Sequence, residues 1–324
     1  MDIQRTLELV TDDLKRVESE FKNSLKSEAH LISTVGEYVL RSGGKRLRPL
    51  ILLLTSKLCG YTGDKHIRLA SVVEFIHTAT LLHDDVVDNA ELRRGLSSAN
   101  SVWGNEASVL IGDFLYSKSF SLAITCNSIK IMQVLSSTTT DMAQGMVFEL
   151  MKTNDIGTSE DEYLRIVTDK TAVLLAAASQ ISGVLGEVDE ERQKGLREYG
   201  MNLGIAFQLV DDSMDYIANE EDFGKTIGTD LQEGKVTLPL IKAIRECSDQ
   251  EKISISALLG AESINENDLK NTLDLINRYD GIGYTINKAK EHIIKAKNSL
   301  DIFEHSIEKE ALFSIADYTL EREN

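Results

Sequence analysis

Apolar residues recur at helical spacing along almost the whole chain, with polar residues between them. In one such stretch the apolar positions Leu69, Val72, Val73, Ile76 and Ala79 step by threes and fours. That period places apolar side chains on one face of a helix, whereas the strict alternation typical of a strand is rare. The pattern therefore predicts about a dozen helices and no major sheet.

Short polar breaks such as "CGYTGDK" and "GEVDEE" separate these predicted helices. We find no linker, internal repeat or strand-helix alternation between them. We therefore predict one all-α domain over residues 1–324, built as a helical bundle. The two longer irregular stretches, 93–106 and 219–237, each follow a cluster of aspartates.

Composition agrees with a helical chain and limits its partners. The chain has only two prolines, Pro49 and Pro239, and is rich in good helix formers. Its 35 basic and 52 acidic side chains give a formal net charge of −17. This excess disfavours a general attraction to nucleic acid or to anionic membranes. An anionic ligand must therefore be bound by a local group of basic side chains.

The cysteines and the N-terminal segment indicate the compartment. Cys59, Cys126 and Cys247 are far apart and form no CxxC spacing, so we predict neither a disulfide framework nor a zinc site. The N-terminal segment lacks a basic region followed by an apolar one, and no apolar run approaches the roughly 18 residues of a membrane span. We expect a cytoplasmic protein without a membrane span.

Two aspartate clusters, in "HDDVVDNAELRRG" and "FQLVDDSMDY", end apolar helical runs. Residues four apart in a helix are offset by about 40°, so Asp84 and Asp88 share one face, with Asp85 beside them. His77 lies on that face too. The second cluster repeats the arrangement with four side chains on one stripe, namely Gln208, Asp211, Asp212 and Asp215.

Acidic pairs are common on exposed helix faces, so solvated surface is the alternative explanation for each cluster. Repulsion argues against it, because two carboxylates about 5 Å apart, at an effective dielectric constant near 20, repel each other by about 3 kcal/mol. A bound cation turns that repulsion into affinity. Carboxylate oxygens suit hard divalent ions, Mg²⁺ above all, and the lack of His and Cys among them argues against zinc.

Four basic islands stand out in this acidic chain. They are "SGGKRLRPL" with Lys45, Arg46 and Arg48, the pair Arg93 and Arg94, "TDKTA" with Lys170 and Thr171, and "FGKTIGTDLQEGK" with Lys225 and Lys235. Ordinary surface charge can explain any single island. Four islands combined with two metal-type clusters instead indicate two phosphorylated substrates, one bridged by Mg²⁺ to both aspartate stripes and one held mainly by Lys and Arg.

In order along the chain, "GGKRLRP", "HDDVVDNAELRRG", "FQLVDDSMDY" and "GKTIGTDLQEGK" resemble the successive signatures of the trans-isoprenyl diphosphate synthases. The resemblance covers residues 36–242 and is closest to the long-chain, octaprenyl diphosphate synthase type, which makes quinone side chains. It implies the isoprenoid synthase fold, a helical bundle in which the two aspartate motifs face each other across a deep central cavity. It also implies a homodimer.

The resemblance further implies a role for each matching residue. The metal ligands would be Asp84, Asp88 and Asp211, and the supporting catalytic aspartates Asp85, Asp212 and Asp215. The contacts to isopentenyl diphosphate would be Lys45, Arg48, His77 and Arg94. The contacts to the allylic diphosphate would be Arg93, Lys170, Thr171, Gln208, Lys225 and Lys235, of which Lys170 and Lys225 would also act in catalysis.

The implied reaction is Mg²⁺-dependent loss of diphosphate from the allylic substrate, attack by isopentenyl diphosphate on the resulting cation, and loss of a proton. In the family, small residues one turn before the first aspartate motif let the growing chain pass. Ala79 and Thr80 therefore predict a long-chain product. A tight helix contact is the alternative explanation for Ala79.

Three other functions stay open. A short-chain farnesyl or geranylgeranyl diphosphate synthase would differ in product length alone. A class I terpene cyclase typically carries Asn, Ser or Thr, and Glu at its second metal site, where this chain has a second aspartate motif. A noncatalytic regulatory subunit of a heteromeric prenyl synthase would be expected to lose aspartates or basic contacts, and none is lost here.

Overall fold

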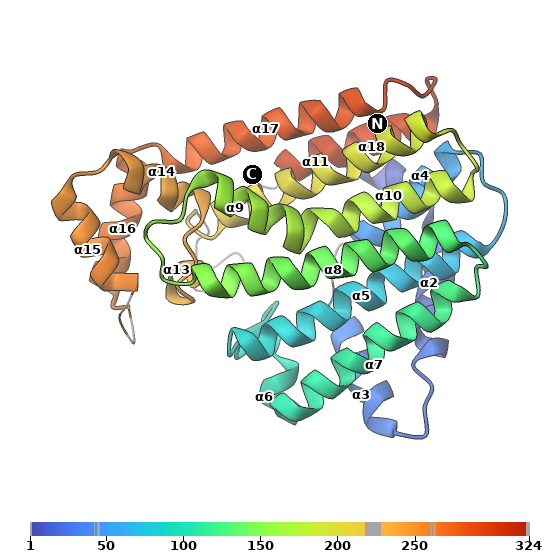
Figure 1. Cartoon of the computed structure of the whole chain (residues 1–324), viewed down its shortest axis with the longest axis horizontal. Coiled ribbons are helices and arrows are strands. Elements are labelled where there is room, and N and C mark those ends of the chain that lie inside the picture. Colours follow the sequence, from blue (N-terminus) through green and yellow to red (C-terminus); the bar gives the residue numbers. More distant parts are fainter. Residues whose placement is uncertain are drawn as a thin grey trace. The chain divides into compact units, whose positions relative to one another are not determined.

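The computed structural model describes residues 2–41, 43, 46–217, 228–259, 261 and 264–321. Helices dominate this part of the chain, whose only sheet is a hairpin of β1 (Leu92–Arg93) and β2 (Leu96–Ser97) (Figure 1). The predicted all-α fold is therefore confirmed. No helix in the described ranges is both long enough and apolar enough to cross a bilayer.

The chain divides into two compact units. Unit 1 comprises Met1–Thr139, Leu174–Gly200 and Ser299–Ile315, and unit 2 comprises Thr140–Val173, Met201–Asn298 and Ala316–Asn324. Three helices contribute a turn or more to each unit, namely α8 (Ile129–Lys152), α11 (Glu190–Met214) and α18 (Ile307–Glu321). The single domain expected over residues 1–324 stays a prediction.

Unit 1 is organised around one long buried helix. Its helices in chain order are α1 (Ile3–Glu8), α2 (Thr11–Ser24), α3 (His30–Arg41), α4 (Leu47–Leu58), α5 (Lys65–Val87), α6 (Ala99–Trp103), α7 (Asn105–Ile124) and α10 (Val173–Leu185). Because α5 is apolar around most of its circumference, it is buried by α7, α2 and α4. Phe21 of α2 stacks on Phe75 of α5 with ring centroids 4.0 Å apart. This packing fixes α5 and so positions the aspartates at its end.

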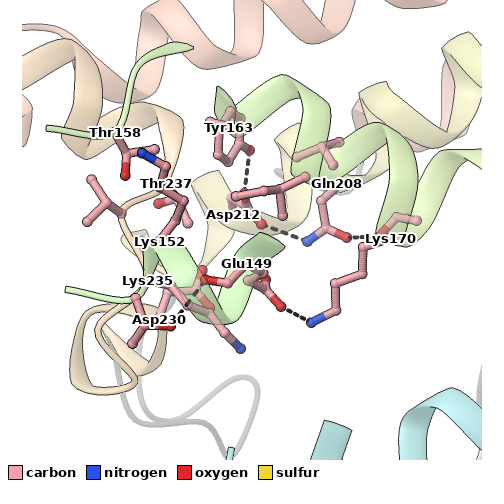
Figure 2. Close-up of a pocket in the computed structure, with 15 residues that line it drawn as sticks. Glu149, Lys152, Thr158, Tyr163, Lys170, Gln208, Asp212, Asp230, Lys235 and Thr237 are labelled. Carbon is pink, nitrogen blue, oxygen red and sulfur yellow. Dashed lines mark hydrogen bonds and ion pairs between the residues drawn. The ribbon is translucent and has the colours of Figure 1, made fainter. Parts of the chain in front are cut away.

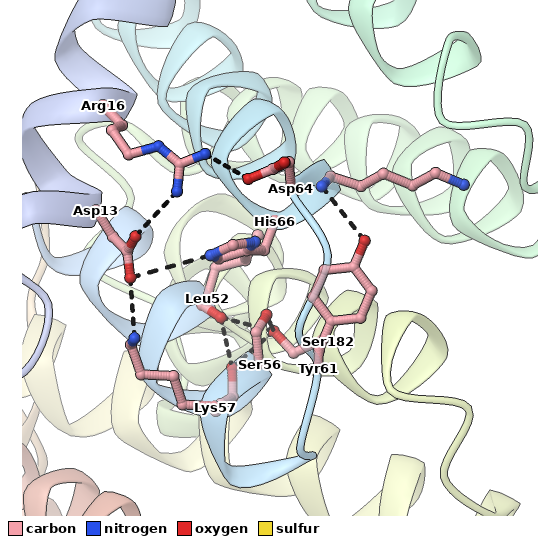
Figure 3. Close-up of polar contacts among 11 residues, drawn as sticks. Asp13, Arg16, Leu52, Ser56, Lys57, Tyr61, Asp64, His66 and Ser182 are labelled. Atoms are coloured by element: carbon pink, nitrogen blue, oxygen red, sulfur yellow. Dashed lines mark hydrogen bonds and ion pairs between the residues drawn. The ribbon is translucent and has the colours of Figure 1, made fainter.

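Ion pairs attach helix α2 to α4 within unit 1 (Figure 3). The carboxylate of Asp13 lies 3.0 Å from Nζ of Lys57 on α4 and 3.4 Å from the guanidinium of Arg16. Nε2 of His66, in the first turn of α5, lies 4.0 Å from the same carboxylate. Burial lowers the pKa of His66 below its usual value. Asp13 therefore joins three helices of the unit through its charge.

The stretch 93–106, expected to be irregular, includes the end of β1, all of β2 and α6, and the start of α7. The two turn residues, Arg94 and Gly95, have φ of 53° and 77°. Two positive φ values in a two-residue loop match the type I′ turn, whose twist suits a hairpin. Elements this short carry too few residues to show a hydrophobic period, which is why the sequence did not predict them.

Unit 2 contains the remaining helices of the described residues. In chain order they are α9 (Glu160–Val167), the π-helical turn η1 (Thr168–Ala172), α13 (Thr229–Gln232), α14 (Leu238–Glu246), α15 (Asp249–Leu259), α16 (Glu266–Arg278) and α17 (Gly281–Ser299). A Cβ on Gly145 of α8 would lie 2.8 Å from the backbone nitrogen of Lys170, so glycine allows α8 to approach η1 closely. Single π-helical turns are frequent at functional sites, and η1 carries "TDKTA".

Candidate functional site

The first aspartate motif occupies the last turn of α5 in unit 1. Asp88 caps this helix, and its N–H donates to the carbonyl of Asp84 at 2.8 Å, so both carboxylates leave the helix on the same side and are partly exposed. Asp85 is buried, and its Oδ1 accepts a hydrogen bond from Nε of Arg93 at 2.5 Å. Asp84 and Asp88 therefore differ from Asp85, which is buried and bonded to the hairpin.

His77, two turns before Asp84, lies within a group of arginines in unit 1. Its pKa is held well below the usual value, first by burial and then by the positive charges of Arg48, Arg94, Arg93 and Arg46. The imidazole is therefore neutral near pH 7 and does not add to the repulsion between these cations. The structure brings Arg48, His77 and Arg94 together, as the sequence prediction requires, while Lys45 lies outside the described residues.

The arginines of this group bear the marks of an anion site. Burial lowers the pKa of Arg48 to about 10, and its buried Nε has no hydrogen-bond partner among the described residues. An unpaired buried donor costs about 1–3 kcal/mol unless a ligand satisfies it. Arg46 and Arg94 have φ of 48° and 53°. This left-handed conformation costs on the order of 1–3 kcal/mol in a non-glycine residue and is often found where a ligand is bound.

The second aspartate motif lies at the end of α11 in unit 2. Asp212 is buried, where its Oδ2 accepts the hydroxyl hydrogen of Tyr163 and its Oδ1 accepts Nε2–H of Gln208 at 2.7 Å. Burial raises the pKa of Asp212 to about 7, although these hydrogen bonds act in the opposite direction. Asp215 accepts the backbone N–H of Asp230 at 3.0 Å. Asp211, beside Asp212, is partly exposed.

A pocket of about 110 Å³ opens beside Asp212 within unit 2 (Figure 2). Four of the residues predicted to contact the allylic diphosphate line it, namely Lys170, Thr171, Gln208 and Lys235. The ammonium of Lys170 pairs with Glu149, and that of Lys235 lies 2.6 Å from Glu233. The hydroxyl of Thr171 donates to Oε1 of Gln208 at 2.9 Å. An incoming anion would compete with these carboxylates for the two lysines.

The remaining residues of that set lie elsewhere. Arg93 belongs to unit 1, and Lys225 lies outside the described residues. The structure also adds pocket residues that the sequence prediction missed, namely Glu149, Tyr163, Asp230 and Thr237. Asp230 stands inside "GTDLQEGK", and Tyr163 precedes Lys170 by about two helical turns, so both could have been found from spacing. Glu149 gives no such signal.

The donors of the two aspartate stripes fit a hard divalent ion. Within the described ranges, no three His, Cys, Asp or Glu side chains come together as a ready-made metal site. Mg²⁺ does not require one, since it commonly uses one or two carboxylates together with waters and substrate phosphates. The partly exposed carboxylates of Asp84 and Asp88, and that of Asp211, suit this mode of binding.

The two residues predicted to control product length lie on different faces of α5. Ala79 is fully buried in the core of unit 1 with Phe75 and Leu82. Thr80 is also buried, and its hydroxyl donates to the carbonyl of His77 at 2.8 Å. By helical period, Thr80 shares its face with His77 and Asp84. Ala79 thus makes a tight helix contact, and its role in product length stays a prediction.

Comparisons with known proteins agree with the resemblance in the motifs. Residues 29–276 match the model of the polyprenyl synthetase family. The chain is 39% identical over 323 residues to octaprenyl diphosphate synthase of Escherichia coli strain K12, covering 100% of both chains. It is 40% identical over 326 residues to that of Haemophilus influenzae strain ATCC 51907, covering 99% of this chain and 98% of the other.

A solved structure has the same fold. It is the polyprenyl synthase from Caulobacter crescentus CB15 complexed with calcium and isoprenyl diphosphate, with a TM-score of 0.95 and 39% identity. The match covers 100% of this chain and 98% of that one. The family predicted from the motifs is therefore confirmed.

Proposed function

Because this chain belongs to the polyprenyl synthetase family, we propose that it is an Mg²⁺-dependent trans-polyprenyl diphosphate synthase of the long-chain, octaprenyl type. It condenses isopentenyl diphosphate repeatedly onto an allylic diphosphate. The observation that carries this proposal is the pocket of unit 2, where Lys170, Thr171, Gln208 and Lys235 meet beside the second aspartate motif.

The arginine group around His77 binds isopentenyl diphosphate. Arg48 supplies a buried donor that lacks a protein partner in the described structure, and Arg94 reaches the group from the tip of the hairpin. Neutral His77 adds a hydrogen bond without adding charge, and we assign Lys45 to the same diphosphate. Such charge-assisted hydrogen bonds suit isopentenyl diphosphate, whose carbon–oxygen bond must stay intact during the reaction.

The pocket of unit 2 binds the allylic diphosphate. Its oxygens replace Glu149 and Glu233 as partners of Lys170 and Lys235, while Thr171 and Gln208 orient them. We assign Arg93 and Lys225 to the same anion. Asp84, Asp88 and Asp211 would hold the divalent ions, which would supply positive charge to the departing diphosphate. The calcium in the Caulobacter crescentus relative supports divalent ions here, and the carboxylate donors favour Mg²⁺.

The reaction needs few chemical groups from the protein. Lysine and arginine side chains stabilise the leaving charge, which is the electrostatic role expected when a carbon–oxygen bond ionises. The π electrons of isopentenyl diphosphate then attack the allylic cation. We assign the final proton to the departed diphosphate, because no side chain of the two sites is an obvious general base. Water has to be excluded, since it would quench the cation.

The working form is proposed to be a cytoplasmic homodimer. On α7, Leu110 and Ile124 are exposed on one side of the helix, with the small residues Ser117 and Ser121 between them. Exposed apolar side chains around small residues suit close packing against a second copy. The product is lipid-like. No helix of the described residues could span a membrane.

The purified chain tests this proposal directly. Incubated with Mg²⁺, farnesyl diphosphate and labelled isopentenyl diphosphate, it should yield a ladder of prenyl diphosphates ending at octaprenyl length, and none in the presence of a chelator. A ladder ending at geranylgeranyl length would identify a short-chain synthase. A single cyclic hydrocarbon would indicate a cyclase, and activity that appears only with a partner protein would indicate a regulatory subunit.

A further inference from the structure

Tyr163, which the sequence prediction did not include, makes a buried hydrogen bond to one of the predicted site residues. Its side chain is 4% exposed, on α9, and its hydroxyl donates to Oδ2 of Asp212 (Figure 2). Asp212 is itself buried, so this contact is shielded from water and cannot be replaced by a solvent hydrogen bond at no cost. Tyr163 also lines the pocket proposed for the allylic diphosphate.

The helix that carries Tyr163 is firmly held. Ser159 and Glu162 form a reciprocal capping box at its start. Lys152 of α8 lies 2.8 Å from the carboxylate of Glu162, the residue directly before Tyr163. At the first residue of the helix, Glu160 accepts the hydroxyl of Tyr284 on α17 at 2.8 Å. These contacts fix the position of α9, so the hydroxyl of Tyr163 is held in place and can orient a neighbouring group.

Asp212 passes this orientation on to the pocket. While Oδ2 accepts from Tyr163, Oδ1 accepts Nε2–H of Gln208 at 2.7 Å. The other end of that amide, Oε1, accepts the hydroxyl of Thr171 at 2.9 Å. Four side chains thus form one chain of hydrogen bonds. Because Asp212 accepts from Gln208, the amide oxygen of Gln208 is the end that faces Thr171.

We propose that Tyr163 is a positioning residue for the allylic diphosphate, acting through Asp212 on Gln208 and Thr171. The inference rests on the proposed function and adds to it a residue whose hydroxyl acts through its hydrogen bond to Asp212. Without the hydroxyl, Asp212 can rotate, and the amide of Gln208 loses the fixed acceptor that determines which of its ends faces Thr171. The diphosphate would then meet a pocket with the wrong donors or with donors out of place.

The test is Tyr163→Phe, which removes one oxygen and keeps the ring. Because the lost hydroxyl is the donor that fixes the carboxyl group of Asp212, kcat/KM for the allylic diphosphate should fall about 10-fold or more. The KM for isopentenyl diphosphate should stay within about two-fold of wild type, because the arginine group around His77 is not part of this hydrogen-bond chain. A tyrosine with only a structural role would affect the kinetics of both substrates alike.

Tyr199→Phe is the matched control. Tyr199 is fully buried in unit 1, and its hydroxyl donates to the carbonyl of Leu312 at 2.8 Å. Loss of this hydroxyl should lower the melting temperature about as much as Tyr163→Phe does. Both KM values should stay unchanged. Equal kinetic effects of Tyr163→Phe and Tyr199→Phe would overturn the proposal, as would a Tyr163→Phe chain that fails to fold while Tyr199→Phe folds.

A double-mutant cycle with Asp212→Asn checks the route of the effect. If Tyr163 acts through Asp212, the double variant should bind a non-cleavable allylic analogue as Asp212→Asn alone does. Additive losses would contradict the route through Asp212 and overturn the proposal. A wild-type chain that forms no prenyl product would instead remove the proposed function, so the two failures are distinguishable.

Discussion

Nε of Arg93 lies 2.5 Å from Oδ1 of Asp85, joining the hairpin to the last turn of α5 within unit 1. The pair divides the first aspartate motif into two kinds of carboxylate. Asp85 is buried and pairs with an arginine, whereas Asp84 and Asp88 are partly exposed. The same contact orients the turn that carries Arg94.

Asp85→Asn should therefore weaken both the fold and the isopentenyl diphosphate site. Breaking a buried pair costs several kcal/mol, but Arg93 is 30% exposed, so we expect a loss of about 1–2 kcal/mol in the free energy of unfolding. The KM for isopentenyl diphosphate should rise as the hairpin loosens. Urea unfolding and steady-state kinetics measure the two effects. Glu91→Gln, an exposed change of the same charge next to the hairpin, is the control, and equal stability of the two variants would contradict the assignment.

The stability of the fold should depend on pH through Asp212. Burial raises its folded-state pKa to about 7, above the ordinary value of 3.8, so the folded state holds the proton more tightly than the unfolded chain. The resulting contribution to stability is present below pH 4 and is lost as pH rises to 7. Measured with a chelator present, wild type should lose stability relative to Asp212→Asn by about 1–4 kcal/mol between pH 4 and pH 8. If the free energies of unfolding of the two proteins changed in parallel with pH, burial would not raise the pKa of Asp212.

Ala79→Tyr should shorten the product. The substitution adds a large ring where Ala79 is packed in the core of unit 1, at a cost in stability of about 1–3 kcal/mol. If the growing chain passes this part of α5, the ring should stop it early, and sizing of the extracted lipids would detect the change. Ala311→Tyr makes the same change at another fully buried position, on α18, and should destabilise without shortening. A wild-type product ladder from Ala79→Tyr would refute the chain-length assignment.

The charge of Asp13 should matter for stability and not for chemistry. Asp13→Asn removes the ion pair with Lys57 on α4 (Figure 3), for an expected loss of about 1 kcal/mol because the carboxylate is largely buried. Asp12→Asn, at the adjacent position, breaks a fully solvated pair with Lys15 and should cost a few tenths of a kcal/mol at most. Thermal unfolding distinguishes them, and product length should be that of wild type in both. A shorter or longer product from Asp13→Asn would contradict this expectation and show that α2 influences the site.

The helical fold was predictable because its signal is periodic. Apolar steps such as Leu69, Val72 and Ile76 repeat often enough to define a buried face, and α5 is that prediction realised. The β1–β2 hairpin was not predictable in this way, because two-residue strands show no period. Its cause is local, in the positive φ of Arg94 and Gly95.

The site was predictable to the extent that its residues stand in dense charged motifs. Lys170, Thr171, Gln208 and Lys235 come from separate motifs and meet in one pocket. Glu149 was missed because it is an ordinary residue in an amphipathic helix until the fold brings it to Lys170. Tyr163 has a signal in its spacing from Lys170, but its hydrogen bond to Asp212 required the structure. The structure was also needed to show that Asp85 and Asp212 are the buried members of the two aspartate stripes. The six carboxylates cannot be told apart by sequence alone.

We propose that Asp84, Asp88 and Asp211 bind the allylic diphosphate through divalent ions. Calorimetric titration with a non-cleavable farnesyl diphosphate analogue tests it most directly. We predict tight binding with Mg²⁺, at least about 10-fold weaker binding without it, and a comparable loss in Asp84→Asn and in Asp211→Asn. Binding that is independent of Mg²⁺, or that survives both substitutions unchanged, would contradict the account.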